Sequence, residues 1–485
     1  MSAGQTLIDQ VTDLAEHCRG TVPELASEYG EILDRIDQPL RVAIAGKVKA
    51  GKSTLLNALL GAELAASDAG ECTRIVTWYQ HDVELTVTAE TNVGTFPLPF
   101  TEQNRRLDID LGDRHYEDFQ RIVVGAPLNG LHTTSLIDTP GMASLSTGIA
   151  AKSTEFLTPE DGTSTVVDAV LYLLRHLHAT DVSFLHAFHD REFASPSPVN
   201  CLGVLSRADE VAAGRLDAME SAAKIARRYS GDQRLRRLVQ GVVPVAGLIG
   251  QASATLVHQD FLDLEKLVSI DEGPAQLVLL SIDRFLTDPS LDLAHERRQH
   301  LLDRLGLFGL RLIDAKVRDA TVQSPDDVRD LLRDTSGIDH LDETLGTMFG
   351  GRRDTLKARS ALVTIERLMG EVDHPRDALA MLERIWASAH DFAELRTLNV
   401  LRDANIGLTD DQAAEVERAL GGLGTTVADR TGLGPDATDE QYRAALLDTI
   451  SRWRTIGANP IADRSISALS DVVIRSCEGA FSQVG

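Results

Sequence analysis

Residues 46–54 read Gly-Lys-Val-Lys-Ala-Gly-Lys-Ser-Thr, and this segment is the strongest indication of the fold. They match the pattern GxxxxGK[ST], in which glycines let backbone N–H groups curl around a phosphate while the lysine reaches its oxygens. The stretch follows a short apolar run at 41–45 and opens a helical run at 55–60. Because a strand before the loop and a helix after it are the context that phosphate binding needs, we predict a P-loop NTPase.

The positions of this loop have expected roles in holding a nucleoside triphosphate. Lys52 would reach the β- and γ-phosphate oxygens, and Ser53 would offer its hydroxyl to Mg²⁺. Contacts with the phosphates are expected from Gly46, Lys47, Val48, Lys49, Ala50, Gly51, Lys52, Ser53 and Thr54. A glycine-rich turn without a ligand is the alternative, and the flanking strand and helix weigh against it.

Two later segments are expected to complete the Mg²⁺ and γ-phosphate site. Asp138 and Gly141 belong to an Asp-Thr-Pro-Gly segment after the expected strand 133–137, so the carboxylate could hold Mg²⁺ through water and the glycine amide could contact the γ-phosphate. Thr73 lies about twenty residues beyond the P-loop, where a switch loop supplies a second hydroxyl to Mg²⁺. The expected metal ligands are Ser53, Thr73 and Asp138, and the expected catalytic residues are Lys49, Lys52 and Thr73.

Recognition of the base is assigned to residues 206–209, Ser-Arg-Ala-Asp, directly after the apolar run 201–205. The Asp209 carboxylate would accept from guanine N1–H and the 2-amino group, a donor pair that adenine does not present. Arg207, next to Ser206, could lay its stem on the base plane. After the last expected strand, Ala246 and Gly247 would place a backbone N–H near guanine O6. We therefore expect GTP and GDP as ligands together with Mg²⁺, and adenine is the alternative because the segment lacks the usual Asn or Thr followed by Lys.

The distribution of apolar residues divides the chain into three parts. Residues 1–38 show helical spacing and are expected to pack with a C-terminal bundle, whereas residues 39–288 alternate short apolar runs with helical stretches, as in a mostly parallel sheet. Residues 289–485 contain helix start signals at Ser324, Thr409 and Thr438. The predicted fold class is an α/β P-loop GTPase domain, with helices on both faces of its sheet, plus an all-α helical bundle built from N- and C-terminal segments.

Charge and cysteine content limit the partners and the compartment. A net charge of −25 argues against nucleic acid as a partner, because such binding depends on Lys and Arg that neutralise phosphates. The cysteines, Cys18, Cys72, Cys201 and Cys477, fit neither a metal pattern nor a disulfide framework, and the N-terminus does not read as a signal peptide. We expect a cytoplasmic protein. The uncharged stretch 238–257 holds proline and glycines, so we expect a strand, a loop and a helix start there, not a membrane span.

Three segments are candidates for peripheral contact with the inner face of the plasma membrane. The basic residues Arg352, Arg353, Lys357 and Arg359 could attract an anionic surface, and a solvated bundle face is the alternative. The apolar segment 305–313 could insert at a bilayer interface, and a hinge or packed helix is the alternative. The glycine-rich stretch 421–434 is expected to be a long loop and is a third candidate.

Together these motifs resemble those of dynamin-like GTPases. The resemblance rests on Thr73-Arg74, on the Asp-Thr-Pro-Gly segment at 138–141, and on helical segments before and after the nucleotide-binding part. It is closer to one group, the isoniazid-inducible IniC proteins of actinobacteria, through residues 39–57, 73–78, 202–218, 305–311 and 356–362. The resemblance implies a mechanochemical GTPase that acts at or near membranes, with a dynamin-type GTPase domain at 39–288.

Several positions depart from the dynamin pattern. Dynamins have Gln and Ser in the middle of the P-loop, where the Ser helps to hold a monovalent cation, but this chain has Val48 and Lys49. The acidic partner on the loop after the run 169–174 is replaced near His176. The Lys49 ammonium group could take the place of the cation and counter charge in the transition state, and a solvent-facing lysine is the alternative. Met142 stands where other GTPases have a water-orienting Gln, so we expect slow basal hydrolysis.

Two functions remain open from the sequence. The first is a GTPase whose cycle drives dimerisation through GTPase domains and rearrangement of the helical bundle, in membrane remodelling or maintenance. The second is a weakly hydrolysing GTP-binding scaffold, or a regulatory subunit that works with a paralogous dynamin-like subunit. The intact Lys52, Ser53 and Asp138 favour the first, and Met142 with the altered base motif favours the second.

Overall fold

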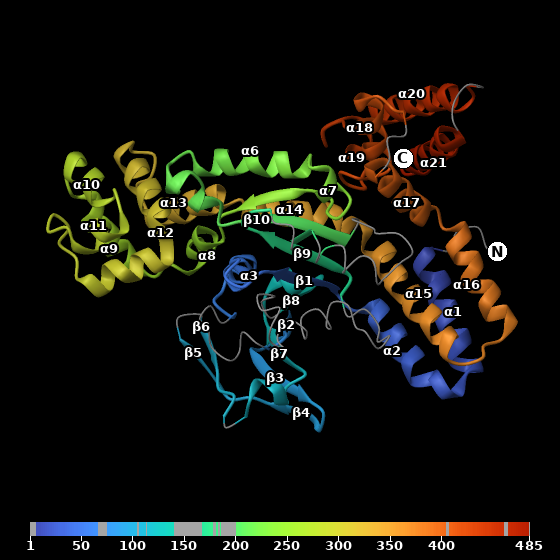
Figure 1. Ribbon diagram of the computed structural model, residues 1–485, viewed down its shortest axis with the longest axis horizontal. Coiled ribbons are helices and arrows are strands. Elements are labelled where there is room, and N and C mark those ends of the chain that lie inside the picture. The colour runs from blue at the N-terminus through green and yellow to red at the C-terminus, as the bar shows by residue number, and fades with distance from the viewer. Residues whose placement is uncertain are drawn as a thin grey trace.

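The computed structural model describes residues 6–65, 75–103, 106–112, 114–139, 167–177, 181–182, 185, 200–403, 407–459 and 464–484. A twisted sheet lies at the centre of the molecule (Figure 1). One helical group extends from the sheet on the left of the view, and two further groups lie at the right, where α1 and the last helices are found. The sequence-based fold class is confirmed, since an α/β domain is joined to helices from both ends of the chain.

The central sheet has nine strands in the order β11-β10-β9-β1-β8-β2-β7-β3-β4. The strands from β11 to β8 in this order run parallel, whereas β2 pairs antiparallel with β8 and β3 and β4 form an antiparallel hairpin. The strands are β1 (Leu40–Gly46), β2 (Thr77–His81), β3 (Thr86–Thr91), β4 (Gly94–Pro97), β7 (Arg121–Ala126), β8 (Thr134–Asp138), β9 (Ala169–Leu174), β10 (Cys201–Ser206) and β11 (Val242–Val245). A separate hairpin pairs β5 (Phe100–Gln103) with β6 (Arg106–Ile109).

Two hydrophobic cores cover the two faces of this sheet. Along β9, Val170, Tyr172 and Leu174 point into one core, and the alternate residues Leu171 and Leu173 point into the other. The first core includes α6 (Ala218–Ser230), and the second includes α3 (Lys52–Leu60) and α14 (Ile338–Met348). The continuous apolar runs in the sequence are thus explained by strands that are buried on both faces.

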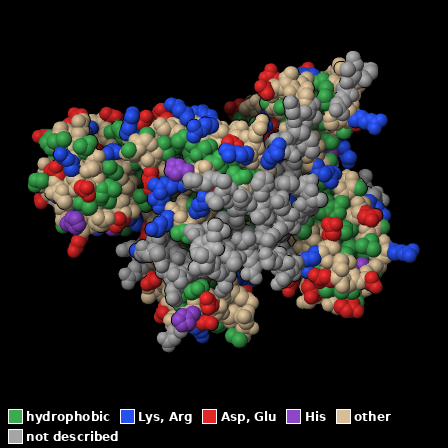
Figure 2. Space-filling view, viewed as in Figure 1, with side chains coloured by type: hydrophobic (Ala, Val, Ile, Leu, Met, Phe, Trp, Pro, Cys, Tyr) green, Lys and Arg blue, Asp and Glu red, His purple; other side chains and the backbone are tan. Residues whose placement is uncertain are grey.

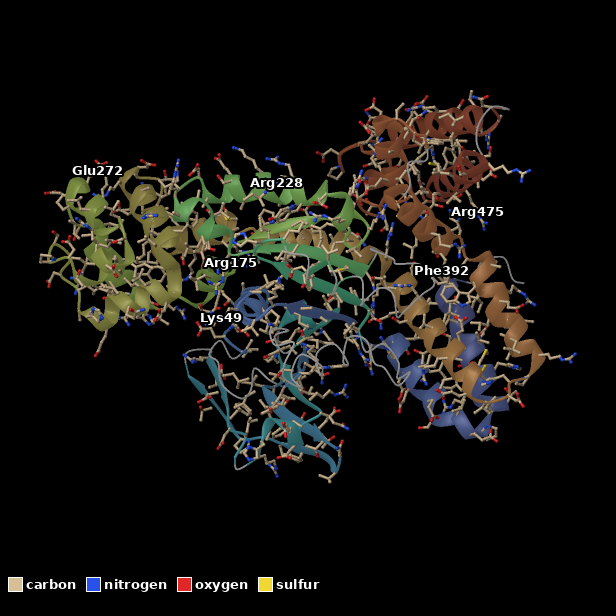
Figure 3. The ribbon with its side chains drawn as sticks, viewed as in Figure 1. Lys49, Arg175, Arg228, Glu272, Phe392 and Arg475 are labelled. Carbon is tan, nitrogen blue, oxygen red and sulfur yellow. The ribbon has the colours of Figure 1, made fainter. Side chains whose placement is uncertain are left out.

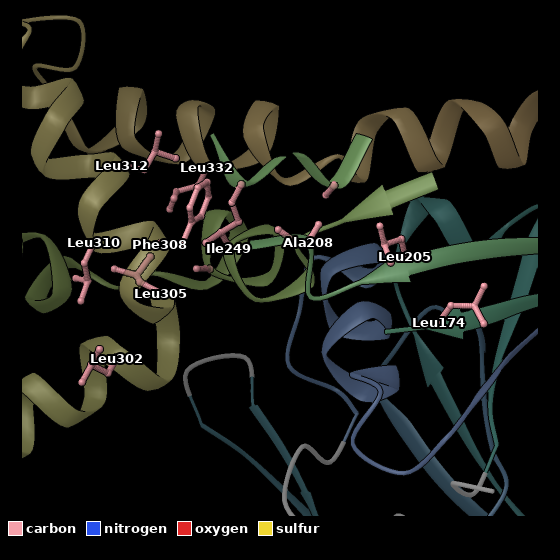
Figure 4. Packing of buried hydrophobic residues seen from close by; sticks show 14 of the residues in the cluster. Leu174, Leu205, Ala208, Ile249, Leu302, Leu305, Phe308, Leu310, Leu312 and Leu332 are labelled. Atoms are coloured by element: carbon pink, nitrogen blue, oxygen red, sulfur yellow. The ribbon is translucent and has the colours of Figure 1, made fainter. Parts of the chain in front are cut away.

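Helices α8 to α13 extend the first core away from the sheet. Leu305, Phe308 and Leu310 are buried there with Ile249 and Leu332 (Figure 4). The segment 305–313 is therefore part of a packed helix, and the sequence hypothesis that it inserts at a bilayer is wrong. The helices are α8 (Gly247–Thr255), α9 (His258–Val268), α10 (Glu272–Val278), α11 (Ile282–Thr287), α12 (His295–Arg318) and α13 (Pro325–Ser336).

The part of the chain beyond residue 288 contributes to the cores of the sheet before it reaches the bundle. Helices α12 and α13 share the first core, and α14 with Phe349 shares the second. The domain division expected at residue 288 stays a prediction, but the packing joins residues 289–349 to the sheet. Sequence periodicity shows that a helix has an apolar face and does not show which core that face meets.

A helical bundle unites the two ends of the chain. It consists of α1 (Leu7–Thr21), α2 (Ala26–Asp37), α15 (Arg353–Glu371) and α16 (Arg376–Ser388), which share one hydrophobic core. The Tyr29 hydroxyl lies 2.7 Å from His374 Nε2, a hydrogen bond between α2 and the turn before α16. The expectation that residues 1–38 pack with a C-terminal bundle agrees with this arrangement.

A second bundle closes the chain around a core of its own. It contains α17 (His390–Asp403), α18 (Asp410–Ala419), α19 (Val427–Thr431), α20 (Asp439–Gly457) and α21 (Arg464–Phe481), with Trp453 fully buried. Capping boxes begin α18 at Thr409 and α20 at Thr438, as the sequence indicates. The stretch 421–434, expected to be a loop, holds the short helix α19. Within the described ranges, every helix is too short or too polar to traverse a bilayer.

Candidate functional site

The P-loop connects the end of β1 with the first turn of α3. Gly46 has a φ of +151°, and a Cβ at this position would lie 3.0 Å from the backbone oxygen of Leu173 on the neighbouring strand β9. Gly51, which precedes α3, has a φ of +92°. Both positions therefore require glycine, because L side chains rarely adopt these angles and the first has no room for one. The loop leaves the amides at the start of α3 directed towards a bound anion.

Lys52 lies in the interior of this loop. Its ammonium group is 3.5 Å from the carbonyl oxygen of Gly46. Burial lowers the pKa of Lys52, and the nearby Asp138 carboxylate opposes that shift. The charge of Lys52 is thus poorly solvated, and negative phosphate oxygens in the loop would stabilise it.

Ser53 in the first turn of α3 meets Asp138 at the end of β8. The Ser53 hydroxyl donates to Asp138 Oδ2 at 3.2 Å. The other oxygen, Oδ1, is buried and receives no hydrogen bond from the described part of the chain. Burial raises the pKa of Asp138, although Lys52 and the Ser53 hydroxyl oppose that shift. A hydroxyl and a carboxylate oxygen that lacks a partner are hard oxygen ligands, so these residues fit the Mg²⁺ ion that the sequence predicts.

Other residues assigned to the γ-phosphate lie outside the described residues. These are Thr73 and Gly141, and Met142 also belongs to this group. Their expected roles as a metal ligand, a γ-phosphate contact and the position of a missing glutamine stay predictions.

A cavity of about 130 Å³ follows the P-loop towards the ends of β10 and β11. Its wall includes Gly51 and Thr54 on one side and Ser206, Asp209 and Gly247 on the other. Asp209 is only 7% exposed, and burial raises its pKa to about 6. A carboxylate at the base of a small cavity next to the P-loop is placed to accept hydrogen bonds from guanine.

Arg207 is held in an unusual backbone conformation at the edge of this cavity. Its φ is +54°, and its guanidinium donates to Glu210 Oε1 at 2.8 Å. The second oxygen of Glu210 accepts from Arg175, at the end of β9, at 2.6 Å. The two arginines are thus clamped by one carboxylate, which fixes Arg207 beside the cavity. Basic side chains gather on this face (Figure 2), in the region where Arg175 and Lys49 are labelled in the same view (Figure 3).

Ala246 and Gly247 have different surroundings. The Ala246 N–H donates to the carbonyl oxygen of Ser336 at 2.8 Å, and Ala246 is fully buried. Gly247 begins α8 and lines the cavity. Of this pair, the Gly247 amide is therefore the group that is placed to approach a base.

The kink in α12 forms part of the support of the base cavity, a role that the sequence does not reveal. Gly306 has a φ of +62°, and a Cβ there would lie 3.4 Å from Leu248 and 3.9 Å from the carboxylate of Asp209. One turn later, Arg311 donates to the carbonyl oxygens of Ala213 and Gly214 at 3.0 and 2.7 Å. These contacts tie α12 to the 3₁₀ segment η6 (Ala208–Gly214) that carries Asp209.

The lysines of the P-loop differ in their contacts. Lys49 is exposed and has a φ of +62°, a conformation that costs energy for a residue with a side chain. Lys47 instead donates to the buried Asp181 at 3.0 Å, and the other oxygen of Asp181 accepts from the Tyr172 hydroxyl at 3.0 Å. The sequence indicated that the acidic residue after β9 is replaced near His176, and it gave no sign of the role of Asp181. The pairing with Lys47 could not be read from spacing, because 134 residues separate the two side chains.

Similarity to known proteins identifies the family to which this chain belongs. Residues 42–175 match the profile of the Dynamin family. The chain is 36% identical over 450 residues to the isoniazid-induced protein IniC of Mycobacterium tuberculosis, an alignment that covers 92% of this chain and 90% of that one. This chain belongs to the IniC-type dynamin-like proteins. The IniC-type assignment thus confirms the resemblance seen in the sequence, and it makes the P-loop site part of a dynamin-type GTPase domain.

Two further relatives of this IniC-type protein are more distant. A bacterial dynamin-like protein of Nostoc punctiforme is 32% identical over 114 residues, which cover 21% of this chain and 16% of that one. A solved structure, from a study of an oligomerised bacterial dynamin pair in membrane sensing and tethering, is 14% identical, with a TM-score of 0.31 over 86% of this chain and 77% of that one.

Proposed function

We propose that this IniC-type protein binds GTP and GDP together with Mg²⁺ and hydrolyses GTP to GDP and phosphate at a slow basal rate. The observation that carries the proposal is the pair Ser53–Asp138, with one buried carboxylate oxygen lacking a partner, beside a cavity that ends at Asp209. Such a site offers hard oxygen ligands at the phosphate end and a hydrogen-bond acceptor at the base end. GTP has matching groups at both ends.

Residues of the P-loop and of β8 would bind and orient the phosphates of GTP and the Mg²⁺ ion. The amides between Gly46 and Ser53 would hold the phosphates, and Lys52 would exchange the Gly46 carbonyl for phosphate oxygens. Ser53 and Asp138 would hold Mg²⁺, with Thr73 as a proposed further ligand; the bound ion would neutralise charge on the β- and γ-phosphate oxygens. Because Lys49 is exposed and free to approach a γ-phosphate, we retain it as the proposed stand-in for a monovalent cation.

We further propose that the nucleotide cycle drives dimerisation through GTPase domains and a movement of the bundle in membrane remodelling or maintenance. The support is the direct connection from α14 on the sheet to α15 of the bundle, through the short turn η7 (Gly350–Arg352). The protein would act in the cytoplasm and at the inner face of the plasma membrane, with itself or a paralogous subunit as partner. The weakly hydrolysing scaffold is the second candidate. The observation that favours it is the half-buried Arg207, which is held by Glu210 and replaces a lysine of the usual motif.

Phosphate release by the full chain tests the proposal and separates the two candidates. The reaction is followed with GTP and Mg²⁺, with and without liposomes, and with Lys52→Ala as the blank. Stimulation by liposomes supports a mechanochemical GTPase, and tight GTP binding with near-zero release supports the scaffold. If GTP fails to bind to a folded protein, the proposed nucleotide function is refuted.

A further inference from the structure

A second cavity lies at the start of β1, at the opposite end of this strand from the P-loop. It has a volume of about 530 Å³ and is enclosed by α2, α15 and the first residues of β1. The P-loop follows the last residue of β1, whereas this cavity is next to Arg41 at its start. The cavity is thus separated from the nucleotide site by the length of one strand. Its helices α2 and α15 belong to the bundle that lies to the right of the sheet in Figure 1.

One buried carboxylate holds this junction together. Asp168, which is 3% exposed, accepts from the Arg35 guanidinium at 3.0 Å, from the backbone N–H of Arg41 at 2.9 Å and from the Ser360 hydroxyl at 3.1 Å. These donors come from α2, β1 and α15. The acceptor capacity of Asp168 is therefore largely used by groups that fix the junction.

Two further cations of the cavity wall form their described contacts with neutral groups. The Lys357 ammonium, on a residue that is 4% exposed, donates to the carbonyl oxygen of Arg35 at 2.8 Å. The Arg41 guanidinium donates to the side-chain oxygen of Gln38 and lies 4.8 Å above the ring of Trp78. Neither contact supplies a negative charge.

The charges next to these two groups are mostly positive. The pKa of Lys357 is lowered to about 8, mainly by burial and in part by Arg353, Arg35 and Arg41, while Asp168 opposes the shift. The pKa of Arg41 is lowered to about 10, again mainly by burial, with Arg35 and Arg121 acting in the same direction and Asp168 opposing them. The cavity wall therefore holds an excess of buried positive charge, which costs free energy unless an anion compensates it.

Apart from the buried Asp168, the negative side chains of the cavity wall lie towards solvent. Glu31 and Asp34 of α2 are exposed, and Glu28 is half-buried. Acidic side chains also gather on the outer surface of the bundle around α2 (Figure 2). A long polyanion would meet these acids at the rim, whereas a compact anion would reach the cations behind them. The arrangement selects for small size as well as for negative charge.

We propose that this cavity binds a compact phosphate group, held by Lys357 and Arg41. The phosphate group can be inorganic phosphate or the phosphate of a lipid headgroup, since both present the same oxygens to the two cations. Occupancy would join α15 to β1 by a second charged contact beside Asp168. The site is independent of the proposed GTP function, because it uses none of the P-loop residues.

Binding of inorganic phosphate to the full chain tests the proposal. The protein is saturated with GDP and Mg²⁺ so that the P-loop is filled, and phosphate is titrated by calorimetry and by thermal unfolding, with chloride at equal ionic strength as the reference. Lys357→Met removes the charge and keeps the length of the side chain. The matched control is Lys266→Met, which changes an exposed lysine on α9. Arg41→Gln serves as a second cavity variant if the first one folds poorly.

We expect phosphate to bind to the unmodified chain and to the control with equal affinity. Lys357→Met or Arg41→Gln should raise the dissociation constant at least about tenfold, the ratio that loss of one charge-assisted hydrogen bond implies. Vesicles of phosphatidylcholine with and without phosphatidic acid give the second arm, in which binding that depends on both phosphatidic acid and Lys357 identifies a lipid headgroup as the source. Equal phosphate affinity in the cavity variants and the control, or no binding of phosphate in either arm, would overturn the proposal.

Discussion

The buried carboxylate of Asp209 makes guanine-nucleotide affinity depend on pH in a predictable direction. Burial raises the pKa of Asp209 to about 6. Only the ionised carboxylate can accept from both guanine N1–H and the 2-amino group, so a proton must leave before the base can bind. Affinity should therefore be highest above the pKa and should fall as pH falls through it.

The size of the effect follows from the fraction of Asp209 that is ionised. For a single group, the apparent dissociation constant is multiplied by 1 + 10^(pKa − pH). With a pKa of about 6, this factor is about 1 at pH 7.5 and about 11 at pH 5. The expected loss of affinity is therefore about tenfold, or ~1.4 kcal/mol.

The measurement is a fluorescence titration of the protein with mant-GDP and Mg²⁺ between pH 5 and 7.5. The terminal phosphate of the nucleotide also titrates near pH 6, so Asp209→Asn provides the necessary control. This variant should bind at least about tenfold more weakly at pH 7.5 and should show a shallower pH dependence, since it retains the phosphate but not the carboxylate. The reasoning is refuted if the variant and the unmodified protein lose affinity in parallel as pH falls.

Three other substitutions probe separate parts of the fold. Gly46→Ala should weaken mant-GDP binding at least tenfold, because a Cβ would lie 3.0 Å from Leu173. Circular dichroism should show no loss of secondary structure. Unchanged binding would contradict the geometry of the loop. Gly346→Ala in α14 should raise the free energy of unfolding by roughly 0.5–1 kcal/mol in urea titrations, since no atom lies within 4 Å of the new methyl group, and a lower midpoint would count against it. Trp453→Ala should destabilise the second bundle by about 3–5 kcal/mol and make α20 sensitive to limited proteolysis. The affinity for GDP should stay the same, because the core that contains Trp453 is separate from the cores of the sheet. Loss of GDP binding together with the loss of stability would contradict this expectation.

The sequence predicts the elements that have local signals. The strand β9 and the capping boxes at Ser324, Thr409 and Thr438 agree with the structure, because buried strands are continuous apolar runs and caps require particular side chains at fixed spacing. The strands between β2 and β7 have weaker patterns and were not predicted. Their half-exposed residues include polar side chains that also occur in loops.

The features that depend on contacts between distant residues could not be predicted. Arg352 and Lys357 illustrate the difficulty, since the sequence suggested that they lie on an exposed patch or a solvated face, whereas the structure buries both residues. Arg352 is 5% exposed and donates to the carbonyl oxygens of Leu420 and Gly421, and Lys357 is 4% exposed next to α2. A charged residue is usually exposed. Only the three-dimensional structure shows which backbone carbonyl oxygens accept hydrogen bonds from a charged residue that is buried.

The nucleotide site shows the same division. The P-loop, Asp138 and Asp209 are marked by short motifs, and the structure brings Asp138 to Ser53 of the loop and Asp209 to the cavity beside it. The pair Lys47–Asp181 and the support of the base cavity by Arg311 arise from long-range packing. Motifs therefore locate the groups that contact a nucleotide, whereas the residues that hold those groups in place become visible only in three dimensions.

The cavity between the P-loop and Asp209 should select a guanine nucleotide. Competition against bound mant-GDP, with unlabelled GTP and ATP in the presence of Mg²⁺, measures this selectivity. We expect GTP to displace the label at concentrations at least a hundredfold below those of ATP, because adenine leaves the buried Asp209 carboxylate without its hydrogen-bond donors. Equal displacement by ATP and GTP, or a preference for GTP over ATP that is unchanged in Asp209→Asn, would show that Asp209 does not select the base.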